Sequence, residues 1–347
     1  MHAADYFPSS PLYRRLSPAV ADDPELLEIA SHGRPGQHEV FLFFGAVHSL
    51  LTKHPDHPAA RHYPDLQAPG DDSDPFPAFR AFCAAHRDEL IDLVATHLVQ
   101  TNEPKRSTGL LLGLAEVQRA DRRPVALVEV GASAGLNLLF DRYAYDFGPG
   151  GKGGVPDSSV TITCTAVGDV MPPVPDALPA VASRIGVDLD PVDVRDPEAV
   201  EWLKALLSPE DTARVQLLTA ACQAAQSDPP EIVGGDVFDV LPTVVKAIPP
   251  GVPVCLFHSS VIFHFPPELR PRFTDMVVDL ARDRDVHWLS VEGAGTTHDV
   301  PPSSHPNFQV VGLTSLSGGH RTDRVLALFD PHGNWIEWLP PSRPGEL

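Results

Sequence analysis

A turn of small residues follows the first strongly apolar run of the chain and could hold a ligand. The run Pro124–Val130 carries the acidic residue Glu129 just before its end, and the turn Gly131–Gly135 leads into an apolar segment. Small side chains let the backbone approach a ligand closely, and a following helix N-terminus points at it. We therefore expect ligand contacts here, the alternative being only a tight strand-to-helix turn. The candidates are Glu129, Gly131, Ala132, Ser133, Gly135 and Asn137.

A second acidic position stands at the end of another apolar run. Ile185-Gly186-Val187 passes into Asp188, Leu189 and Asp190. In nucleoside-binding α/β folds, an acid at the tip of the second strand hydrogen-bonds the ribose hydroxyls. The separation from the small-residue turn exceeds the roughly 20 residues usual in such folds, so an inserted segment is expected between them. The alternative is a solvated turn aspartate.

The spacing Glu-x-Gly-x-Ser-x-Gly resembles the first motif of class I S-adenosylmethionine-dependent methyltransferases. Their second strand commonly reads Gly-hydrophobic-Asp-x-Ser/Asn-Pro, which selects Asp188 over Asp190. The resemblance implies that the turn lines the methionine portion of the cofactor. It also implies that Asp236 accepts from the adenine amino group and that the Val237 N–H donates to the ring. The alternative for this segment is a helix N-cap, for which Asp239 fits.

The ends of two further apolar runs carry candidate substrate and proton-transfer groups. His258 closes the fourth run and could accept a proton near neutral pH, with Ser259 as a substrate contact; the alternative is a buried histidine under the next helix. Glu292 follows the fifth run and is a candidate substrate contact, or else a paired surface carboxylate. Neither the Asn/Asp-Pro-Pro-aromatic sequence of amino-group methyltransferases nor a G-x-S-x-G elbow surrounds His258, and the missing elbow disfavours a hydrolase.

Several strings together resemble a bacterial family catalogued only as a domain of unknown function, over nearly the whole chain. They are Thr101–Ser107, Glu129–Leu138, Asp141-Arg142-Tyr143-x-Tyr145 and Gly186–Pro191. The core of that family resembles the methyltransferase fold, and no activity comes with it. The resemblance implies that Asn102 and Arg106 contact substrate or cofactor from a lid, as does Tyr143, with Glu103 as a second candidate base. The alternative is helix capping by Thr101 or Asn102, with Pro104 in the first helical turn.

Histidines crowd one short stretch of the N-terminal region. Histidines three residues apart on a helix can bind zinc. Prolines interrupt this stretch, however, and no cysteine lies near it, so we expect no metal site and interpret the cluster as a surface loop. Its members are His48, His54, His57 and His62.

Two regions of different periodicity must position these residues. Residues 1–120 indicate a helical cap with helices at 24–30, 39–51, 76–99 and 107–120, and residues 121–347 indicate one α/β domain with an insertion at about 146–182. Apolar runs there alternate with helical segments, which predicts a doubly wound, mostly parallel sheet of Rossmann-like methyltransferase type with a C-terminal antiparallel hairpin. The expected strands are 124–130, 159–167, 183–187, 231–233, 252–257, 286–291, 308–315 and 324–329.

Composition restricts the partners. The 347 residues are 43% hydrophobic and 21% charged, which suits a globular protein. Acidic residues outnumber basic ones 46 to 26, and the net charge of −20 disfavours nucleic acid and anionic membrane and favours a neutral or cationic small acceptor. No apolar run is long enough to span a bilayer, no signal-peptide pattern begins the chain, and four separated cysteines indicate reduced thiols, so we expect a cytoplasmic protein.

These observations predict a methyltransferase that uses S-adenosylmethionine and acts on a small molecule. One alternative is a non-catalytic or repurposed nucleoside-ligand-binding protein with a methyltransferase-like fold, which the missing fourth-strand motif favours. Another is an NAD(P)-dependent oxidoreductase, for which the glycine spacing fits poorly and no Tyr-x-x-x-Lys pair is evident.

Overall fold

The chain forms two compact units, each with its own core. The computed structural model describes residues 10–66, 73–100, 102–298, 303, 305 and 307–340. The first unit contains the described residues up to Asn102 and the segment Arg195–Thr219; the second contains Glu103–Val194 and the described residues from Ala220 onward. This division differs from the expected boundary after residue 120. No helix in the described part is long and apolar enough to cross a membrane.

The first unit is built from helices around an aromatic core. Phe43, Phe44, Phe79 and Phe82 are buried there together with Trp202, which comes from the later segment. The single helix expected over 76–99 is wrong, because non-helical backbone at His86 (φ −115°, ψ 27°) divides it in two. The helices are α1 (Pro11–Ala21), α2 (Pro24–Ala30), α3 (Glu39–Thr52), the 3-10 helix η2 (Pro58–His62), α4 (Phe76–Ala85), α5 (Arg87–Thr96) and α7 (Pro197–Ala205).

The second unit is organised by a nine-stranded sheet whose parallel part reverses its order near the middle. Its spatial order is β5-β12-β11-β10-β9-β8-β1-β6-β7. The strands are β1 (Val125–Val130), β5 (Thr165–Ala166), β6 (Val181–Asp188), β7 (Glu231–Gly234), β8 (Val254–Ser259), β9 (Val286–Gly293), β10 (Gln309–Ser317), β11 (His320–Phe329) and β12 (Trp335–Trp338).

Strands β7, β6, β1, β8 and β9 are parallel neighbours, and numbered along the chain they lie in the order 3-2-1-4-5. The order therefore reverses between β1 and β8, which makes their carboxyl ends a topological switch point, where open α/β sheets bind ligands. Strands β10, β11 and β12 continue the sheet antiparallel, so the mostly parallel sheet and the antiparallel pairing of the C-terminal strands are confirmed.

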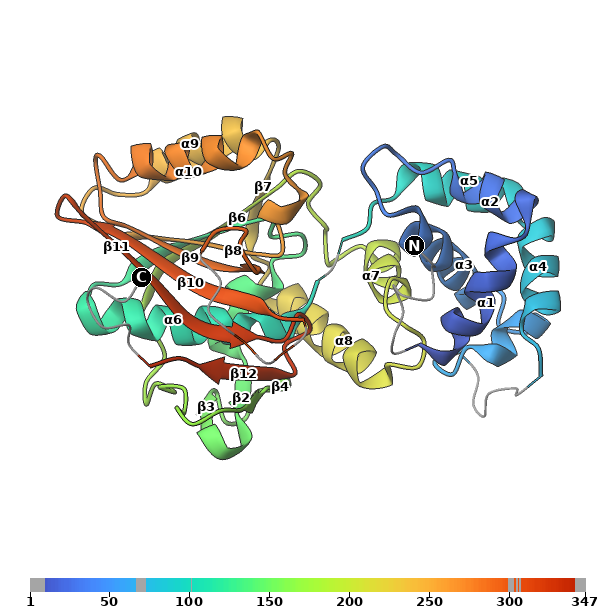
Figure 1. The fold of residues 1–347 in the computed structure, drawn as a ribbon, viewed down its shortest axis with the longest axis horizontal. Coiled ribbons are helices and arrows are strands. Elements are labelled where there is room, and N and C mark those ends of the chain that lie inside the picture. Colours follow the sequence, from blue (N-terminus) through green and yellow to red (C-terminus); the bar gives the residue numbers. More distant parts are fainter. Residues whose placement is uncertain are drawn as a thin grey trace. The chain divides into compact units, whose positions relative to one another are not determined.

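Helices cover both faces of this sheet (Figure 1). On one face, Val128 and Val130 share a core with α9 (Val237–Ala247) and α10 (Leu269–Leu280). On the other lies α6 (Ser107–Ala120), where a Cβ on Gly109 would stand 2.8 Å from Val291 and one on Gly113 would stand 2.4 Å from Leu289. The close packing of α6 on the sheet explains why this helix belongs to the second unit. The helix α8 (Thr212–Ser227) crosses the division between the units.

The segment between β1 and β6 forms a small second sheet, which accounts for the long sequence separation between the turn after β1 and Asp188. Its strand order is β3-β2-β4. The expected strand 159–167 is divided between the two sheets, as β4 and β5. The segment contains the 3-10 helices η4 (Leu136–Arg142) and η5 (Gly148–Gly150) and the strands β2 (Ala144–Asp146), β3 (Lys152–Gly154) and β4 (Thr161–Thr163).

Candidate functional site

The turn after β1 has a backbone that only small residues can form. Gly131 (φ +70°), Ser133 (φ +50°) and Gly135 (φ +69°) all adopt left-handed conformations. A Cβ on Gly131 would lie 2.3 Å from Cγ2 of Val261, and one on Gly135 would lie 2.4 Å from Cγ of Pro230. Glycine is therefore required at both positions, and at each for two reasons: its dihedral angles and the close approach of a neighbouring segment.

Asp188 ties this turn to the end of β6. Its Oδ2 accepts a hydrogen bond from the backbone N–H of Ser133 at 2.7 Å, and its Oδ1 accepts one from the N–H of Asp190 at 2.8 Å. Partial burial raises the pKa of Asp188 above its usual value, and these two hydrogen bonds oppose the shift. The two expected cofactor motifs, far apart in the sequence, are thus in direct contact.

Glu129 and Asn137 form a polar pair with spare hydrogen-bonding capacity beside the same turn. Nδ2 of Asn137 donates to Oε1 of Glu129 at 3.0 Å. Glu129 Oε2 and Asn137 Oδ1 are both buried and have no hydrogen-bond partner among the described residues. Burial raises the pKa of Glu129 to about 8, with the Asn137 hydrogen bond opposing and the Asp188 charge adding to the shift. Buried polar atoms are rarely left unpartnered, so this pair is a candidate ligand contact.

The third expected cofactor contact is the N-cap of a helix. Asp236 Oδ1 accepts from the N–H of Phe238 at 2.8 Å, and α9 begins at Val237. The expected N-cap at Asp239 is wrong, because Asp239 lies inside the first turn of α9. Asp236 is exposed just beyond the carboxyl end of β7, so a ligand at this edge could reach its second oxygen.

His258 is closed off from a substrate on both sides of its ring. Its Nδ1 lies 2.7 Å from Glu292 Oε1, and its Nε2 accepts a hydrogen bond from Nε1 of Trp288 at 2.8 Å. The His258 side chain is fully buried. A base must reach the proton that it removes, so this geometry favours the buried-histidine alternative for His258. Glu292 is likewise buried and is not a surface carboxylate.

Next to the predicted contact Ser259, the structure places two polar residues that were not predicted, Ser260 and Gln309. Ser259 is buried, and its Oγ has no partner among the described residues. Ser260 has φ +55°, and Ser133 is the only other non-glycine residue of the described part with positive φ. Gln309, at the start of β10, donates from Nε2 to Ser260 Oγ at 2.5 Å and leaves its Oε1 unpartnered among the described residues. A glutamine opening an otherwise apolar run was the only sequence signal for this contact.

The segment before α6 is capped by a residue other than those expected. Glu103 is buried and accepts from the N–H of Lys105 at 3.3 Å, which makes it the N-cap of the 3-10 helix η3 (Pro104–Arg106). Thr101 lies outside the described residues, and Asn102 is half-buried. Arg106 is buried and donates to the carbonyl of Pro331.

Tyr143 is a core residue. It is fully buried, and its hydroxyl donates to the carbonyl of Leu136 at 2.7 Å. The residue therefore supports η4 and the turn after β1, and no part of it is presented to a substrate.

The N-terminal histidines take separate structural roles within the first unit. His48 is buried, with Nδ1 3.1 Å from the carbonyl of Ala205 and Nε2 2.8 Å from Asp65. The rings of His54 and His57 pack against Phe82. Burial lowers the pKa of His57, and the neighbouring histidines add to that shift. In the described part of the chain, no group of three or more metal-ligating side chains is placed to hold an ion.

A family model described as "Uncharacterized protein conserved in bacteria (DUF2332)" matches residues 2–338. No curated protein matches the chain. No solved structure matches it either.

Proposed function

The chain belongs to the DUF2332 family, and we propose that it is an S-adenosylmethionine-dependent methyltransferase acting on a small molecule. The observation that carries the proposal is the Glu129–Asn137 pair, whose two unpartnered oxygens lie beside a left-handed glycine turn at the switch point. Adjacent buried acceptors suit a group that brings several N–H donors. The ammonium group in the methionine portion of the cofactor is such a group.

The neighbouring residues fit the remaining parts of the same ligand. Each carboxylate oxygen of Asp188 accepts one backbone N–H and retains a second lone pair, which could accept from a ribose hydroxyl. Asp236 follows β7, the strand next to β6, so an adenine amino group beyond the ribose could reach it. The strand order 3-2-1-4-5 supports a Rossmann-like arrangement of these contacts.

In methyl transfer, the main contribution of this chain would be to position the cofactor and the methyl acceptor. When bound, S-adenosylmethionine supplies a methyl group activated by a cationic sulfur. The turn after β1 and the Glu129–Asn137 pair would fix one reactant, and the Ser259 hydroxyl at the end of β8 would contact the acceptor. Holding two reactants in line contributes a large part of the rate enhancement in such a reaction. His258 has no ring nitrogen accessible to a substrate, so the proposal keeps as its base Glu103, the buried N-cap of η3.

A second candidate function is nucleoside-ligand binding without methyl transfer. The closed hydrogen bonding of His258 favours it, because the histidine near the end of β8 cannot take a proton from an acceptor in this arrangement. Both functions share the ligand contacts, so they differ in turnover and not in binding.

Calorimetric titration with S-adenosylmethionine and with its demethylated product, S-adenosylhomocysteine, tests the shared part. We expect micromolar binding and, for Asp188→Asn, an affinity at least about tenfold weaker, because a charged acceptor is lost. Asp275→Asn, on α10, is the matched control and should bind as the wild type does. Absence of heat at near-millimolar ligand would refute the proposal, and binding without product in any acceptor mixture would favour the second candidate.

A further inference from the structure

A buried chain of hydrogen bonds lies under the turn that follows β8. Trp288 donates from Nε1 to His258 Nε2 at 2.8 Å, and the other ring nitrogen of His258 is 2.7 Å from Glu292 Oε1. The three residues Trp288, His258 and Glu292 are 3%, 0% and 0% exposed. Because an indole N–H can only donate, His258 Nε2 must accept, and the proton of the neutral ring is on Nδ1. His258 therefore donates to Glu292, and the charge of the chain is on the carboxylate.

Glu292 is at the same time the anchor of the turn. Its Oε1 accepts two further hydrogen bonds, from the backbone N–H of Val261 at 2.8 Å and from that of Ile262 at 3.0 Å. Burial alone would raise the pKa of Glu292, but the hydrogen bond from His258 and the two amides lower it below its usual value. An ionised carboxylate thus binds the residues that follow Ser260, whose left-handed backbone needs such external support.

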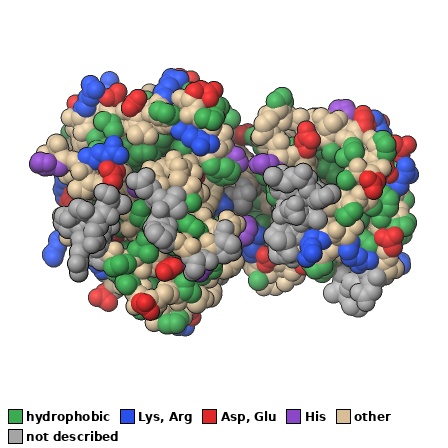
Figure 2. All heavy atoms as spheres, viewed as in Figure 1, with side chains coloured by type: hydrophobic (Ala, Val, Ile, Leu, Met, Phe, Trp, Pro, Cys, Tyr) green, Lys and Arg blue, Asp and Glu red, His purple; other side chains and the backbone are tan. Residues whose placement is uncertain are grey.

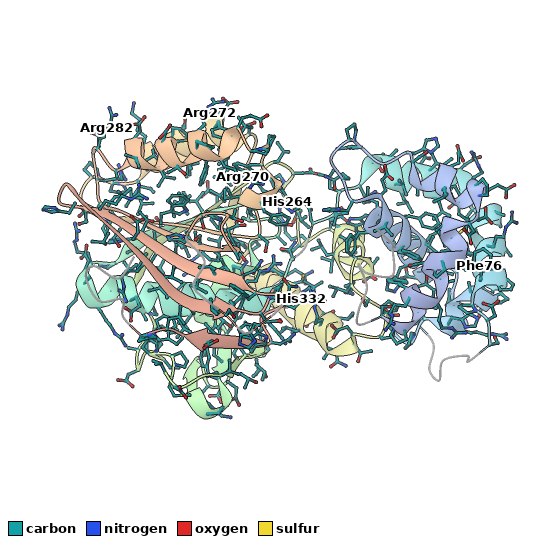
Figure 3. All side chains as sticks on the ribbon, viewed as in Figure 1. Phe76, His264, Arg270, Arg272, Arg282 and His332 are labelled. Carbon is teal, nitrogen blue, oxygen red and sulfur yellow. The ribbon has the colours of Figure 1, made fainter. Side chains whose placement is uncertain are left out.

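The anchored turn is in contact with the turn after β1. Val261 fills the space next to Gly131, where a Cβ would lie 2.3 Å from its Cγ2. Further along, Arg270 donates from Nη2 to the carbonyl of Phe263 at 2.8 Å and thereby holds the short helix η6 (Ile262–His264) to the start of α10 (Figure 3). The position of Val261 therefore sets how closely the two turns approach at the switch point.

We propose that Glu292 is the positioning residue of this site: it holds the turn Ser260–Ile262 against Gly131 and so sets the spacing between the turns after β1 and β8 and the placement of the Ser259 hydroxyl. In this role His258 orients Glu292, and Trp288 selects the tautomer in which His258 can donate. The inference rests on the proposed function only for the identity of the ligand, because the hydrogen bonds exist without one.

The first test is the variant Glu292→Gln, which keeps the size of the side chain but removes the charge that accepts three donors. We expect the dissociation constant of S-adenosylhomocysteine to rise at least about tenfold, since charge-assisted hydrogen bonds are roughly twice as strong as neutral ones. Asp323→Asn is the matched control: this carboxylate accepts from Thr314 and Arg321 in the same sheet and lies on β11, away from both turns, so its variant should bind within about twofold of the wild type.

A second variant and a second readout separate the failures of the two proposals. Val261→Ala leaves the hydrogen bonds intact and shortens the side chain that contacts Gly131. It should weaken binding, and it remains a usable test if Glu292→Gln does not fold. Hydrogen exchange needs no ligand: the amides of Val261 and Ile262 should be protected in the wild type and in Asp323→Asn and should exchange faster in Glu292→Gln. Unchanged binding in Val261→Ala, or unprotected wild-type amides, overturns the inference, whereas protected amides without ligand binding overturn only the proposed function.

Discussion

At the scale of single residues, the most unusual group is the buried carboxyl of Glu129. Its neighbours in β1 are apolar, and its one hydrogen bond comes from a neutral amide, so burial favours the protonated form and raises the pKa to about 8. A buried acid with such a shift marks a candidate functional site, because an unpaired charge in a core lowers stability and is not kept for the fold alone.

The variant Glu129→Gln should remove a pH-dependent loss of stability. The pKa of the folded state lies above the unfolded value of 4.5, so the stabilising effect of the neutral form is complete below pH 4.5 and is lost as the pH rises toward 8. The introduced glutamine can still accept from Asn137 but has no charge to bury. From pH 5 to pH 8, the free energy of unfolding measured with urea should fall by about 4 kcal/mol more in the wild type than in the variant. Parallel pH curves for the two proteins would contradict the assignment.

At the scale of elements, two turns decide the geometry of the site, and each has a left-handed serine and a close neighbour. Gly131 and Gly251 both have positive φ, but a Cβ would meet Val261 at the first position and nothing within 4 Å at the second. Alanine at Gly251 therefore tests backbone strain alone, whereas alanine at Gly131 tests backbone strain together with steric overlap.

Gly251→Ala should cost about 1–2 kcal/mol of unfolding free energy, because a left-handed alanine is strained by that amount. Gly131→Ala should cost about 1–3 kcal/mol more, because the new methyl group overlaps Val261 and overpacking is destabilising. Chemical denaturation of both variants measures the difference. Equal losses of unfolding free energy in the two variants would mean that the turns after β1 and β8 do not touch in solution.

The elements that could be predicted from sequence are those with long apolar runs. Strands β1, β6, β8 and β9 are continuous in the sequence, and the antiparallel pair β10–β11 follows from the absence of a helix between its runs. The short strands β2, β3 and β12 could not be recognised, because three or four residues give no periodicity. Similarly, the apolar pattern of 76–99 continues through His86, and only its backbone angles show the break.

The site was predictable as far as it depends on strand ends. Glu129 and Asp188 were identified because an acid stands at the end of an apolar run, and the structure places both beside the turn after β1. The partners of His258 were not predictable, since Trp288 and Glu292 reach it only through the register of β8 with β9. Gln309 reaches Ser260 from β10 in the same way, by tertiary contact across strands.

At the scale of the whole molecule, the dominant feature is charge. The net charge is −20, and on the face in Figure 2 basic side chains lie interspersed among acidic ones without forming a continuous basic surface among the described residues. Such a field attracts cations and weakens with salt over a Debye length of about 10 Å at 0.1 M.

The proposed function predicts that the affinities for S-adenosylmethionine and S-adenosylhomocysteine depend differently on salt concentration. S-adenosylmethionine carries a sulfonium charge that S-adenosylhomocysteine lacks, and apart from the methyl group the two share every other part. We expect the affinity for the sulfonium form to fall more steeply between low and high ionic strength, with the demethylated form as the internal control. Titration calorimetry at several sodium chloride concentrations gives both slopes. Identical slopes would show that the net charge does not act on the ligand.

The segment Arg195–Thr219 has a consequence for the order in which the chain can fold. It follows β6 of the second unit, yet it completes the core of the first: Trp202 is buried there and donates from Nε1 to the carbonyl of Leu98 at 3.0 Å. During synthesis, domains generally fold as units from the N-terminus. Here the helical unit cannot close until residue 219 has left the ribosome, when β1 and β6 are already outside and still lack β8. The core of the first unit is therefore completed only after β1 and β6 of the second unit have been synthesised.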